Sequence, residues 1–462
     1  MNRYLMCALL VIFAALSSRA ADLPGSEFQK RRQQLMDVLP RGIVLLHARS
    51  DLFSQREMYL HSFQQDPNFY YFTGLENASA AILAIDGVTK QSWLFVPLRL
   101  SGPAGELSRP FVRIEGKPGS ATSIEHIEPW DRFVPFISKR LSDPPNPILF
   151  IDDKGSWFFP ELGESNPQDI VPVENPLLLW KHAVQTKWPD AEIQSASDAI
   201  HSLRFVKSAR EADIMRQVGK ISASATIAAL QALKPGRSQR ELEAEVVREC
   251  IKSGGEGPSF WPWIFSGPAA IPPLPEEGVA DYHRLNRRME SGELAHLDLG
   301  CEFEHYGGDV GRTAPVSGRF NIAQREVWEL LVRAYLAGIA SIRNGATRED
   351  IINACLRQLK HDSSDVKSSL ATKAVAELLG PQGPDKWLIH GAGLECCERP
   401  FISGTLRSGA VVVLEPSFEV DGQAFYLEDM ILVTDEGHEV LTDAIPYSAD
   451  EIERLLAAPA KH

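Results

Sequence analysis

Residues 291–298 have the sequence Ser-Gly-Glu-Leu-Ala-His-Leu-Asp, and residues 408–415 have the sequence Ser-Gly-Ala-Val-Val-Val-Leu-Glu. In both segments a Ser-Gly turn leads into an apolar run typical of a β-strand, which ends in a carboxylate seven residues after the serine. A second carboxylate follows each first one: Asp309 lies 11 residues after the first segment, and Glu428 lies 13 residues after the second. The sequence therefore predicts two related strand pairs that carry two acids each.

The helices that precede these strands repeat as well. Residues 238–241 (Ser-Gln-Arg-Glu) come shortly after a Pro-Gly pair and have the S-x-x-E pattern of a helix-capping box. Residues 347–350 (Thr-Arg-Glu-Asp) come shortly after an Asn-Gly pair and lie 109 positions further along. This internal repeat predicts a duplicated unit of two helices and a sheet, in which the acid pairs of the two halves meet at a pseudo-two-fold axis.

The acids of this repeat indicate a metal site. They are Asp298, Asp309, Glu415 and Glu428. Carboxylates that share a small cavity repel one another unless cations neutralise them or they share protons. A carboxylate-rich site favours hard ions such as Mn²⁺, and an added imidazole shifts the preference toward Co²⁺, Zn²⁺ or Fe²⁺. The imidazole candidate is His390, because the glycines of its His-Gly-Ala-Gly segment let the backbone approach a ligand closely.

The chain of 462 residues has the length of two or three domains. We expect a mixed α/β domain over residues 21–203 and a second domain over residues 204–455, whose first helix opens with a capping box at residues 208–211. In the first domain we expect a helix at 27–38 and strands at 42–46, 68–74, 80–85, 92–96 and 148–151.

The first twenty residues have the pattern of a signal peptide. One arginine precedes an apolar run over residues 5–16, and small residues stand at Ser18 and Ala20, the positions that a signal peptidase reads. The run is too short to span a bilayer, and we expect no membrane anchor. We expect a secreted or periplasmic protein that begins near Ala21; the alternative is a buried N-terminal helix.

Charge and cysteine content bear on the possible partners and on the expected disulfide bonds. The net charge of −14 argues against a nucleic-acid partner, because phosphate binding needs a basic surface. The odd number of cysteines after the signal segment does not suit a disulfide framework, so we expect buried free thiols. These cysteines are Cys250, Cys301, Cys355, Cys396 and Cys397.

The segments that carry the acids resemble the motifs of the pita-bread metallopeptidases, in particular the branch of aminopeptidase P and prolidase. The family's D-x-G and D-x-x-R-T motifs correspond to residues 298–300 and 309–313. Its H-G-x-G-L-E-x-H-E motif corresponds to residues 390–398, which end in Cys-Cys-Glu. Its E-P and E-D strands correspond to residues 415–416 and 428–429.

This resemblance implies a fold and a substrate. It implies an α/β (α+β) chain with a C-terminal pita-bread domain (duplicated ααβ) and an N-terminal, creatinase-like mixed α/β domain. Residues 65–74 are similar to a signature of that N-terminal domain. The implied activity is that of an Xaa-Pro aminopeptidase, which releases the first residue from peptides with proline in second position. The implied assembly is a homo-oligomer.

The resemblance also implies a role for each acid. Asp298 binds one divalent ion, and Asp309 and Glu428 bridge two. His390 and Glu415 complete the shell of the second ion, and Mn²⁺ is the ion that we expect first. The two ions activate a water molecule for attack on the scissile carbonyl. Glu415 is the implied catalytic acid–base, which takes a proton from this water and passes it to the leaving proline nitrogen.

Three positions of the implied catalytic set depart from the family's pattern. Cys397 stands where the family has a second catalytic histidine, and Tyr426 stands where it has an arginine. His283 is assigned to an upstream catalytic histidine, although it lies only fifteen residues before Asp298. A thiol is a weaker hydrogen-bond donor than an imidazole, so we expect slow turnover unless another donor such as His283 compensates.

Two other functions stay open at this stage. A prolidase-type dipeptidase has the same ligands but a site closed to longer peptides. A catalytically silent pita-bread binding protein is the second alternative, which the altered residues favour and the five filled ligand positions oppose. His296 and His305 flank the acids but match no ligand position of the family. Residues 260–263 (Phe-Trp-Pro-Trp) suit a substrate pocket and internal packing equally.

Overall fold

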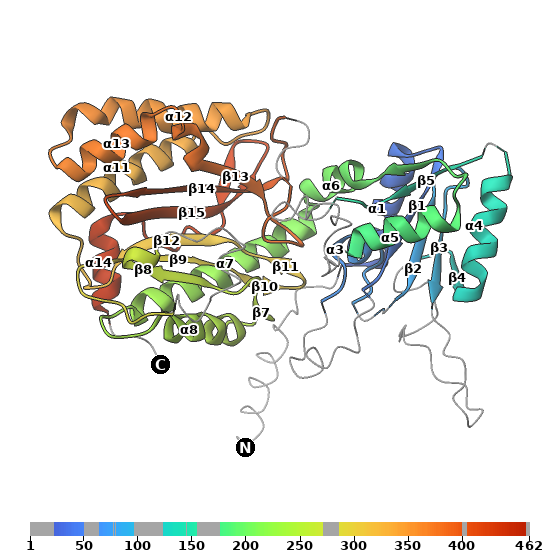
Figure 1. Cartoon of the computed structure of the whole chain (residues 1–462), viewed down its shortest axis with the longest axis horizontal. Coiled ribbons are helices and arrows are strands. Elements are labelled where there is room, and N and C mark those ends of the chain that lie inside the picture. Colours follow the sequence, from blue (N-terminus) through green and yellow to red (C-terminus); the bar gives the residue numbers. More distant parts are fainter. Residues whose placement is uncertain are drawn as a thin grey trace, which may run out of the picture. The chain divides into compact units, whose positions relative to one another are not determined.

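The computed structural model describes residues 23–49, 64–76, 78, 80–96, 123–144, 146–154, 176–270, 286–399 and 404–458. These residues form two compact units, one of residues up to 200 and one of residues from 201 onward (Figure 1). The division falls within helix α6 (Ser197–Phe205), close to the expected boundary between residues 203 and 204. No helix in the described ranges has both the length and the apolar character that crossing a membrane requires.

The first unit is built around a six-stranded mixed sheet with the strand order β4-β3-β2-β1-β5-β6. Its strands are β1 (Gly42–His47), β2 (Ile82–Asp86), β3 (Gln91–Val96), β4 (His126–Pro129), β5 (Ile148–Ile151) and β6 (Ile193–Ser195). Its helices are α1 (Gly25–Val38), α3 (Pro67–Thr73), α4 (Phe133–Ser142) and α5 (Pro176–Lys187), with a 3-10 turn η1 (Trp130–Arg132). The apolar core lies between the sheet and the helices α4 and α5. Four of the five predicted strands are confirmed as β1, β2, β3 and β5.

The fifth predicted strand, at residues 68–74, is wrong: this segment forms helix α3. Its aromatic residues are typical of strands, but the capping signals on either side are those of a helix. The carboxylate of Asp66 accepts the backbone N–H of Phe69, and Pro67 occupies the first turn. Gly74 ends the helix with a left-handed φ of 67°. The end signals therefore decide the conformation of this short segment.

The second unit contains both halves of the predicted repeat. Its main sheet has the order β13-β14-β15-β12-β9-β8, with β16 paired to β15, and a small sheet has the order β11-β10-β7. The strands are β7 (Gly257–Pro258), β8 (Trp263–Ser266), β9 (Leu294–Leu299), β10 (Cys301–Phe303), β11 (Tyr306–Gly307), β12 (Val310–Pro315), β13 (Trp387–Gly391), β14 (Val411–Val420), β15 (Gln423–Val433) and β16 (His438–Val440). The helices are α7 (Ala209–Ala232), α8 (Gln239–Lys252), α11 (Ile322–Ile339), α12 (Arg348–Asp362), α13 (Ser369–Leu379) and α14 (Ala449–Ala457).

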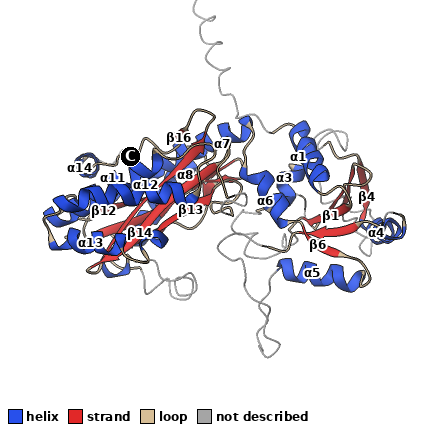
Figure 2. Cartoon of the chain, turned by 90° about the horizontal axis from the view of Figure 1, so that it is seen from above, coloured by secondary structure: helices blue, strands red, loops and turns tan. Residues whose placement is uncertain are grey.

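Helix pairs accompany both halves of this sheet. α7 and α8 pack together and contact the strands β8, β9 and β12, whereas α11 and α12 pack together with α13 beside β14 and β15. Figure 2 shows α11, α12 and α13 alongside the strands. α8 begins at a capping box of Ser238 and Glu241, and α12 begins at one of Thr347 and Asp350. The same local signal thus starts the corresponding helix in each half, as the repeat predicts.

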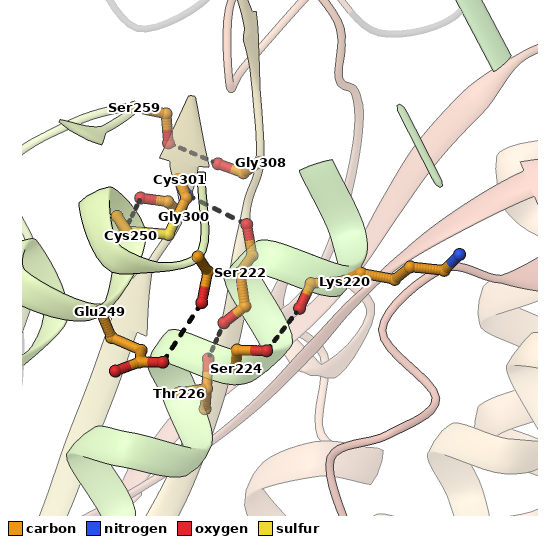
Figure 3. Close-up of a disulfide and its surroundings, with 11 residues drawn as sticks. Lys220, Ser222, Ser224, Thr226, Glu249, Cys250, Ser259, Gly300, Cys301 and Gly308 are labelled. Carbon is orange, nitrogen blue, oxygen red and sulfur yellow. Dashed lines mark hydrogen bonds between the residues drawn. A yellow bond between two sulfur atoms is a disulfide. The ribbon is translucent and has the colours of Figure 1, made fainter. Parts of the chain in front are cut away.

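Cys250 and Cys301 form a disulfide, which corrects the expectation that both are free thiols. They lie 51 residues apart in the sequence, at the end of α8 and in β10, with their Cα atoms 5.5 Å apart (Figure 3). The packing of α8 beside β7 brings the two together, and no spacing in the sequence indicates this. Cys355, Cys396 and Cys397 are the free cysteines of the described residues.

The disulfide lies beside the connection between β9 and β12, which separates the first two acids of the repeat. The backbone N–H of Cys301 donates to Ser222 Oγ at 3.0 Å, and Ser259 Oγ donates to the carbonyl oxygen of Gly308 at 2.7 Å (Figure 3). Gly300 is required at this close approach, because a Cβ there would lie 1.7 Å from the same carbonyl oxygen. The connection is therefore held at several points along its length.

Candidate metal centre

The structure brings the five predicted ligands together in two overlapping groups. In the first, one carboxylate oxygen each of Asp298, Asp309 and Glu428 lies within 4.8 Å of the others. In the second, a ring nitrogen of His390 lies within the same distance of oxygen atoms of Glu415 and Glu428, which also lie within it of each other. Glu428 belongs to both groups, so the two form one continuous cluster.

Strand register explains why the acids meet. Asp298 of β9 and Glu428 of β15 both face Gly311 of the intervening strand β12. Residues that face each other across antiparallel strands point to the same side of the sheet. Asp309 precedes Gly311 by two residues and shares that side. Leu414 of β14 faces Asp429 of β15. In this antiparallel register their neighbours Glu415 and Glu428 share a side of the sheet as well.

His390 is held with its Nε2 atom toward the acids. Its Nδ1 lies 2.9 Å from the carbonyl oxygen of Gly391, which can only accept, so Nδ1 carries the proton and donates. Nε2 then presents its lone pair 3.5 Å from Glu415 Oε2, 3.8 Å from Asp309 Oδ2 and 3.9 Å from Glu428 Oε1. A backbone carbonyl that fixes the tautomer in this way is the usual support of a metal-binding histidine.

The electrostatics of the cluster also suit cations. Burial, followed by repulsion from neighbouring carboxylates, raises the pKa of Asp298, Asp309 and Glu428 well above the usual values. Asp298 Oδ1 and Glu428 Oε1 are buried and have no hydrogen-bond partner among the described residues. Divalent cations would supply the missing partners and cancel the repulsion, so the residues fit a pair of such ions.

Tyr426, one of the positions that depart from the family's pattern, lies beside the same acids. Its hydroxyl donates to Glu428 Oε2 at 2.7 Å. A Cβ on Gly311 would lie 1.9 Å from the Tyr426 ring, so glycine at that position leaves room for the ring. The tyrosine therefore keeps a hydrogen-bond donor beside the acids in the place where the resemblance implies an arginine.

The two histidines that flank the acids lie outside these two groups. His296 stacks on Tyr426 with the ring centroids 4.1 Å apart, and burial lowers its pKa to about 3. It is therefore neutral, and neither of its ring nitrogens has a hydrogen-bond partner among the described residues. His305 lies in a separate, more exposed group with Glu256 and Glu302.

The aromatic residues at 260–263 serve different purposes. Trp263 of β8 faces Asp298 of β9 and packs edge to face on Phe265 with the ring centroids 6.1 Å apart. Trp261 is half exposed, and its indole N–H donates to Glu243 at 2.9 Å. The segment therefore contributes packing, and it also presents an indole next to the acids.

Two parts of the chain match known protein families, and one of them contains the cluster. Residues 213–435, which contain all five predicted ligands, match the profile of metallopeptidase family M24. Residues 28–104 match the profile of the aminopeptidase P N-terminal domain. The second domain of the chain belongs to metallopeptidase family M24.

Relatives match the chain over half to nearly all of its length. The Xaa-Pro aminopeptidase of Escherichia coli is 26% identical over 96% of this chain and 100% of its own. An Xaa-Pro dipeptidase of Pyrococcus horikoshii is 30% identical over 54% of this chain and 66% of its own. The solved structure of Escherichia coli aminopeptidase P with the inhibitor Pro-Leu has a TM-score of 0.70 at 22% identity and covers 96% of this chain and 100% of its own. This likeness shows the expected fold.

Two further residues were predicted for the catalytic set. His283 lies outside the described residues. Cys397 is buried, and its Sγ lies 3.4 Å from Asp309 Oδ2 and 3.2 Å from the Sγ of Cys396. The hydrogen bond with Cys396, together with burial, raises the pKa of the Cys397 thiol well above its usual value. Cys397 thus lies among the predicted ligands and not at the edge of the site.

An ion-pair cluster holds the segment that carries both adjacent cysteines. Glu398 is buried and pairs with Arg204 Nη2 at 2.8 Å through one oxygen and with Lys207 Nζ at 2.7 Å through the other. It also accepts the backbone N–H of Leu394. Burial raises the pKa of Glu398, but the opposing charges of Lys207 and Arg204 outweigh it and lower the pKa to about 2. The carboxylate is therefore charged at all ordinary pH values.

Glu398→Gln should destabilise the chain by about 3 to 5 kcal/mol at neutral pH, because it removes the carboxylate that pairs with the buried Lys207 and one of the two carboxylates that pair with Arg204. The ion pairs are complete above the ordinary glutamate pKa of 4.5 and are lost as the pH falls through the folded value of about 2. The difference between wild type and variant in urea unfolding should therefore shrink between pH 7 and pH 3. The matched control is Glu395→Gln, since Glu395 pairs with Arg204 from a more exposed position. An equal loss in both variants, or one independent of pH, would contradict this role of Glu398.

Proposed function

We propose that this chain is a metal-dependent Xaa-Pro aminopeptidase, which cleaves the bond before a proline in second position and releases the first residue. The observation that carries the proposal is the grouping of His390 with four acids in an M24 domain, preceded by an aminopeptidase P N-terminal domain. A relative named Xaa-Pro aminopeptidase matches both domains together, over 96% of this chain.

Two divalent ions are the proposed cofactors. Asp298, Asp309 and Glu428 offer oxygen atoms to one ion, and His390, Glu415 and Glu428 offer donors to the other, which Asp309 can also reach through Oδ2, 3.8 Å from His390 Nε2. Four carboxylates among five ligands favour Mn²⁺, with Co²⁺, Zn²⁺ and Fe²⁺ as the alternatives. When bound, the two metal ions would supply a Lewis acid for the scissile carbonyl and an activated water.

Glu415 is the proposed proton carrier. Its side chain is 18% exposed, against 5% for Asp309 and 1% for Glu428, so it is the acid of these three that a substrate can reach. A carboxylate at the edge of the cluster can take the proton of the attacking water and deliver it to the proline nitrogen. Glu428 is in contrast buried and held by Tyr426, which suits a fixed ligand.

The substrate's apolar proline ring has a partner in Trp263. This partly exposed indole lies on β8 directly opposite Asp298, at the edge of the acid cluster. Proline rings and indole faces pack well because both are apolar and rigid. Peptides are therefore the proposed partners, and the acidic net charge of −14 opposes nucleic acid.

The test is turnover of a tripeptide of the Arg-Pro-Pro type and of the dipeptide Gly-Pro, each with added Mn²⁺ and with a chelator. We expect release of the first residue from the tripeptide with Mn²⁺ and none with the chelator. Cleavage of the dipeptide alone would instead support the Xaa-Pro dipeptidase. Metal binding without turnover of either peptide would support the silent binding protein.

We further propose that the protein is exported and that it assembles as a homo-oligomer. The disulfide between Cys250 and Cys301 supports export, because such bonds persist in oxidising compartments. N-terminal sequencing of the native protein should begin near Ala21. Recovery of a cytosolic chain that starts at Met1 would contradict export, and sedimentation as a monomer would contradict the assembly.

A further inference from the structure

A third group of potential ligands shares two residues with the metal centre. It consists of Asp309, His390 and Cys397, whose ligand atoms all lie within 4.8 Å of one another and whose side chains are all buried. Cys397 Sγ lies 3.4 Å from Asp309 Oδ2. The same oxygen atom lies 3.8 Å from His390 Nε2. One oxygen atom thus lies within 4 Å of both a thiol and an imidazole.

The separations of Asp309 Oδ2 from Cys397 Sγ and from His390 Nε2 both suit contact with a single cation. Bonds from a divalent ion such as Zn²⁺ are about 2.3 Å to sulfur and about 2.1 Å to oxygen or nitrogen. The observed separation of 3.4 Å between Sγ and Oδ2 then corresponds to an angle of about 100° at the ion. The separation of 3.8 Å between Oδ2 and Nε2 corresponds to about 130°. Both angles are near those of tetrahedral or five-coordinate sites.

The backbone and the ion pairs fix Cys397 in this place. Gly391, the residue after His390, exchanges two backbone hydrogen bonds with Glu398, the residue after Cys397, at 3.2 and 2.7 Å. The Glu398 side chain is anchored in turn by its buried ion pairs with Arg204 and Lys207. The thiol therefore sits on a segment tied to the strand that carries His390, as a preformed ligand requires.

We propose that Cys397 is itself a metal ligand: its thiolate binds the cation held by Asp309 and His390 and turns the preference of the centre from Mn²⁺ toward thiophilic Zn²⁺. The inference rests on the proposed metallopeptidase function and replaces the role of hydrogen-bond donor that the sequence implies for this position. The thiol proton leaves to solvent as the sulfur–metal bond forms. Thiolate ligands select Zn²⁺ over Mn²⁺ because sulfur is soft and Mn²⁺ prefers oxygen.

Cobalt absorption tests the sulfur–metal bond without reference to activity. The full chain, freed of metal and with its free thiols kept reduced under argon, is titrated with Co²⁺. Bound Co²⁺ gives visible bands in any site, and a thiolate ligand adds a sulfur-to-cobalt charge-transfer band in the near ultraviolet. We expect both kinds of band in the wild type and in the matched control Cys396→Ser. We expect Cys397→Ser to keep the visible bands and to lose the near-ultraviolet band.

The outcomes distinguish a failure of the thiolate-ligand proposal from a failure of the proposed metallopeptidase function. Visible bands without the near-ultraviolet band in the wild type, or a near-ultraviolet band that survives in Cys397→Ser, would overturn the thiolate ligand and leave the metallopeptidase intact. The absence of every band would show that no cobalt binds, which would overturn the proposed function as well.

Calorimetry with the metals alone gives a second measure. Cys397→Ser should weaken Zn²⁺ binding by about tenfold to a hundredfold and leave Mn²⁺ binding within about threefold, since only the soft ligand is lost. Cys397→Ala serves the same purpose if the serine variant does not fold. Equal losses for Zn²⁺ and Mn²⁺, or none for Zn²⁺, would overturn the proposal.

Discussion

Glu415→Gln should lower kcat/KM for an Xaa-Pro tripeptide by about 10³-fold or more. The amide cannot take up the proton of the attacking water, and loss of a positioned acid–base alone costs about 10²- to 10⁴-fold. The substitution also weakens one ligand of the group that contains His390 and Glu428. The measurement is kcat/KM at saturating metal, with circular dichroism to show that the fold is kept.

The control for this variant lies on the same strand. Glu419 is exposed and follows Glu415 by four residues on β14, outside both ligand groups. Glu419→Gln should keep kcat/KM within about twofold, as exposed substitutions usually do. If Glu415→Gln retains more than about a tenth of the wild-type kcat/KM, Glu415 is not the proton carrier.

Removal of metal should lower the melting temperature by roughly 10 °C at neutral pH. A ligand at about a thousand times its Kd stabilises a protein by about 4 kcal/mol, and each kcal/mol shifts the melting temperature of a domain of this size by about 2–4 °C. Without cations, Asp298, Asp309 and Glu428 repel one another in a buried site. The measurement is thermal unfolding with and without a chelator.

The pH dependence of this deficit follows from the raised pKa values of the three acids. The folded, metal-free protein holds protons that the unfolded chain releases, so its stability falls as the pH rises from the ordinary carboxylate pKa through the raised values. Bound cations remove that penalty. The difference in melting temperature between loaded and chelated protein should therefore be largest at neutral pH and narrow as the pH approaches 5. A chelator that leaves the melting temperature unchanged at neutral pH would contradict the presence of structural cations.

The grouping of the acids could be predicted from the sequence because its signals are local. In each half of the repeat a Ser-Gly turn precedes a strand that ends in an acid. These segments are residues 291–298 and 408–415. Strand alternation and antiparallel pairing then suffice to put Asp298 and Glu428 on one side of the sheet. The capping boxes that start α8 and α12 are local signals of the same kind.

What the sequence did not show depends on contacts between distant residues. The Cys250–Cys301 disulfide joins two elements that meet only through the packing of α8. The ion pair of Arg204 with Glu398 spans 194 residues. Helix α3 is a different case, in which aromatic composition outweighed the Asp-Pro and Gly signals that decide a short helix.

Tyr426 shows that comparing a residue with a family's motif does not by itself reveal what the substituted side chain does. Tyrosine in place of arginine reads as the loss of a donor, yet its hydroxyl lies 2.7 Å from Glu428 and still donates. This arrangement exists because Gly311 leaves space for the ring, a steric fact that belongs to the neighbouring strand. The register between β12 and β15 is needed to see it.

Metal content per chain is the decisive quantity, measured by elemental analysis of the native protein after exhaustive dialysis against metal-free buffer. We predict two divalent ions per chain in the wild type and a loss of at least one in Asp309→Asn, because Asp309 belongs to two of the ligand groups. The exposed-site variant Glu419→Gln should keep both ions. A wild-type protein that binds no divalent ion, or one whose metal content is unchanged in Asp309→Asn, would contradict a metal centre built from these residues.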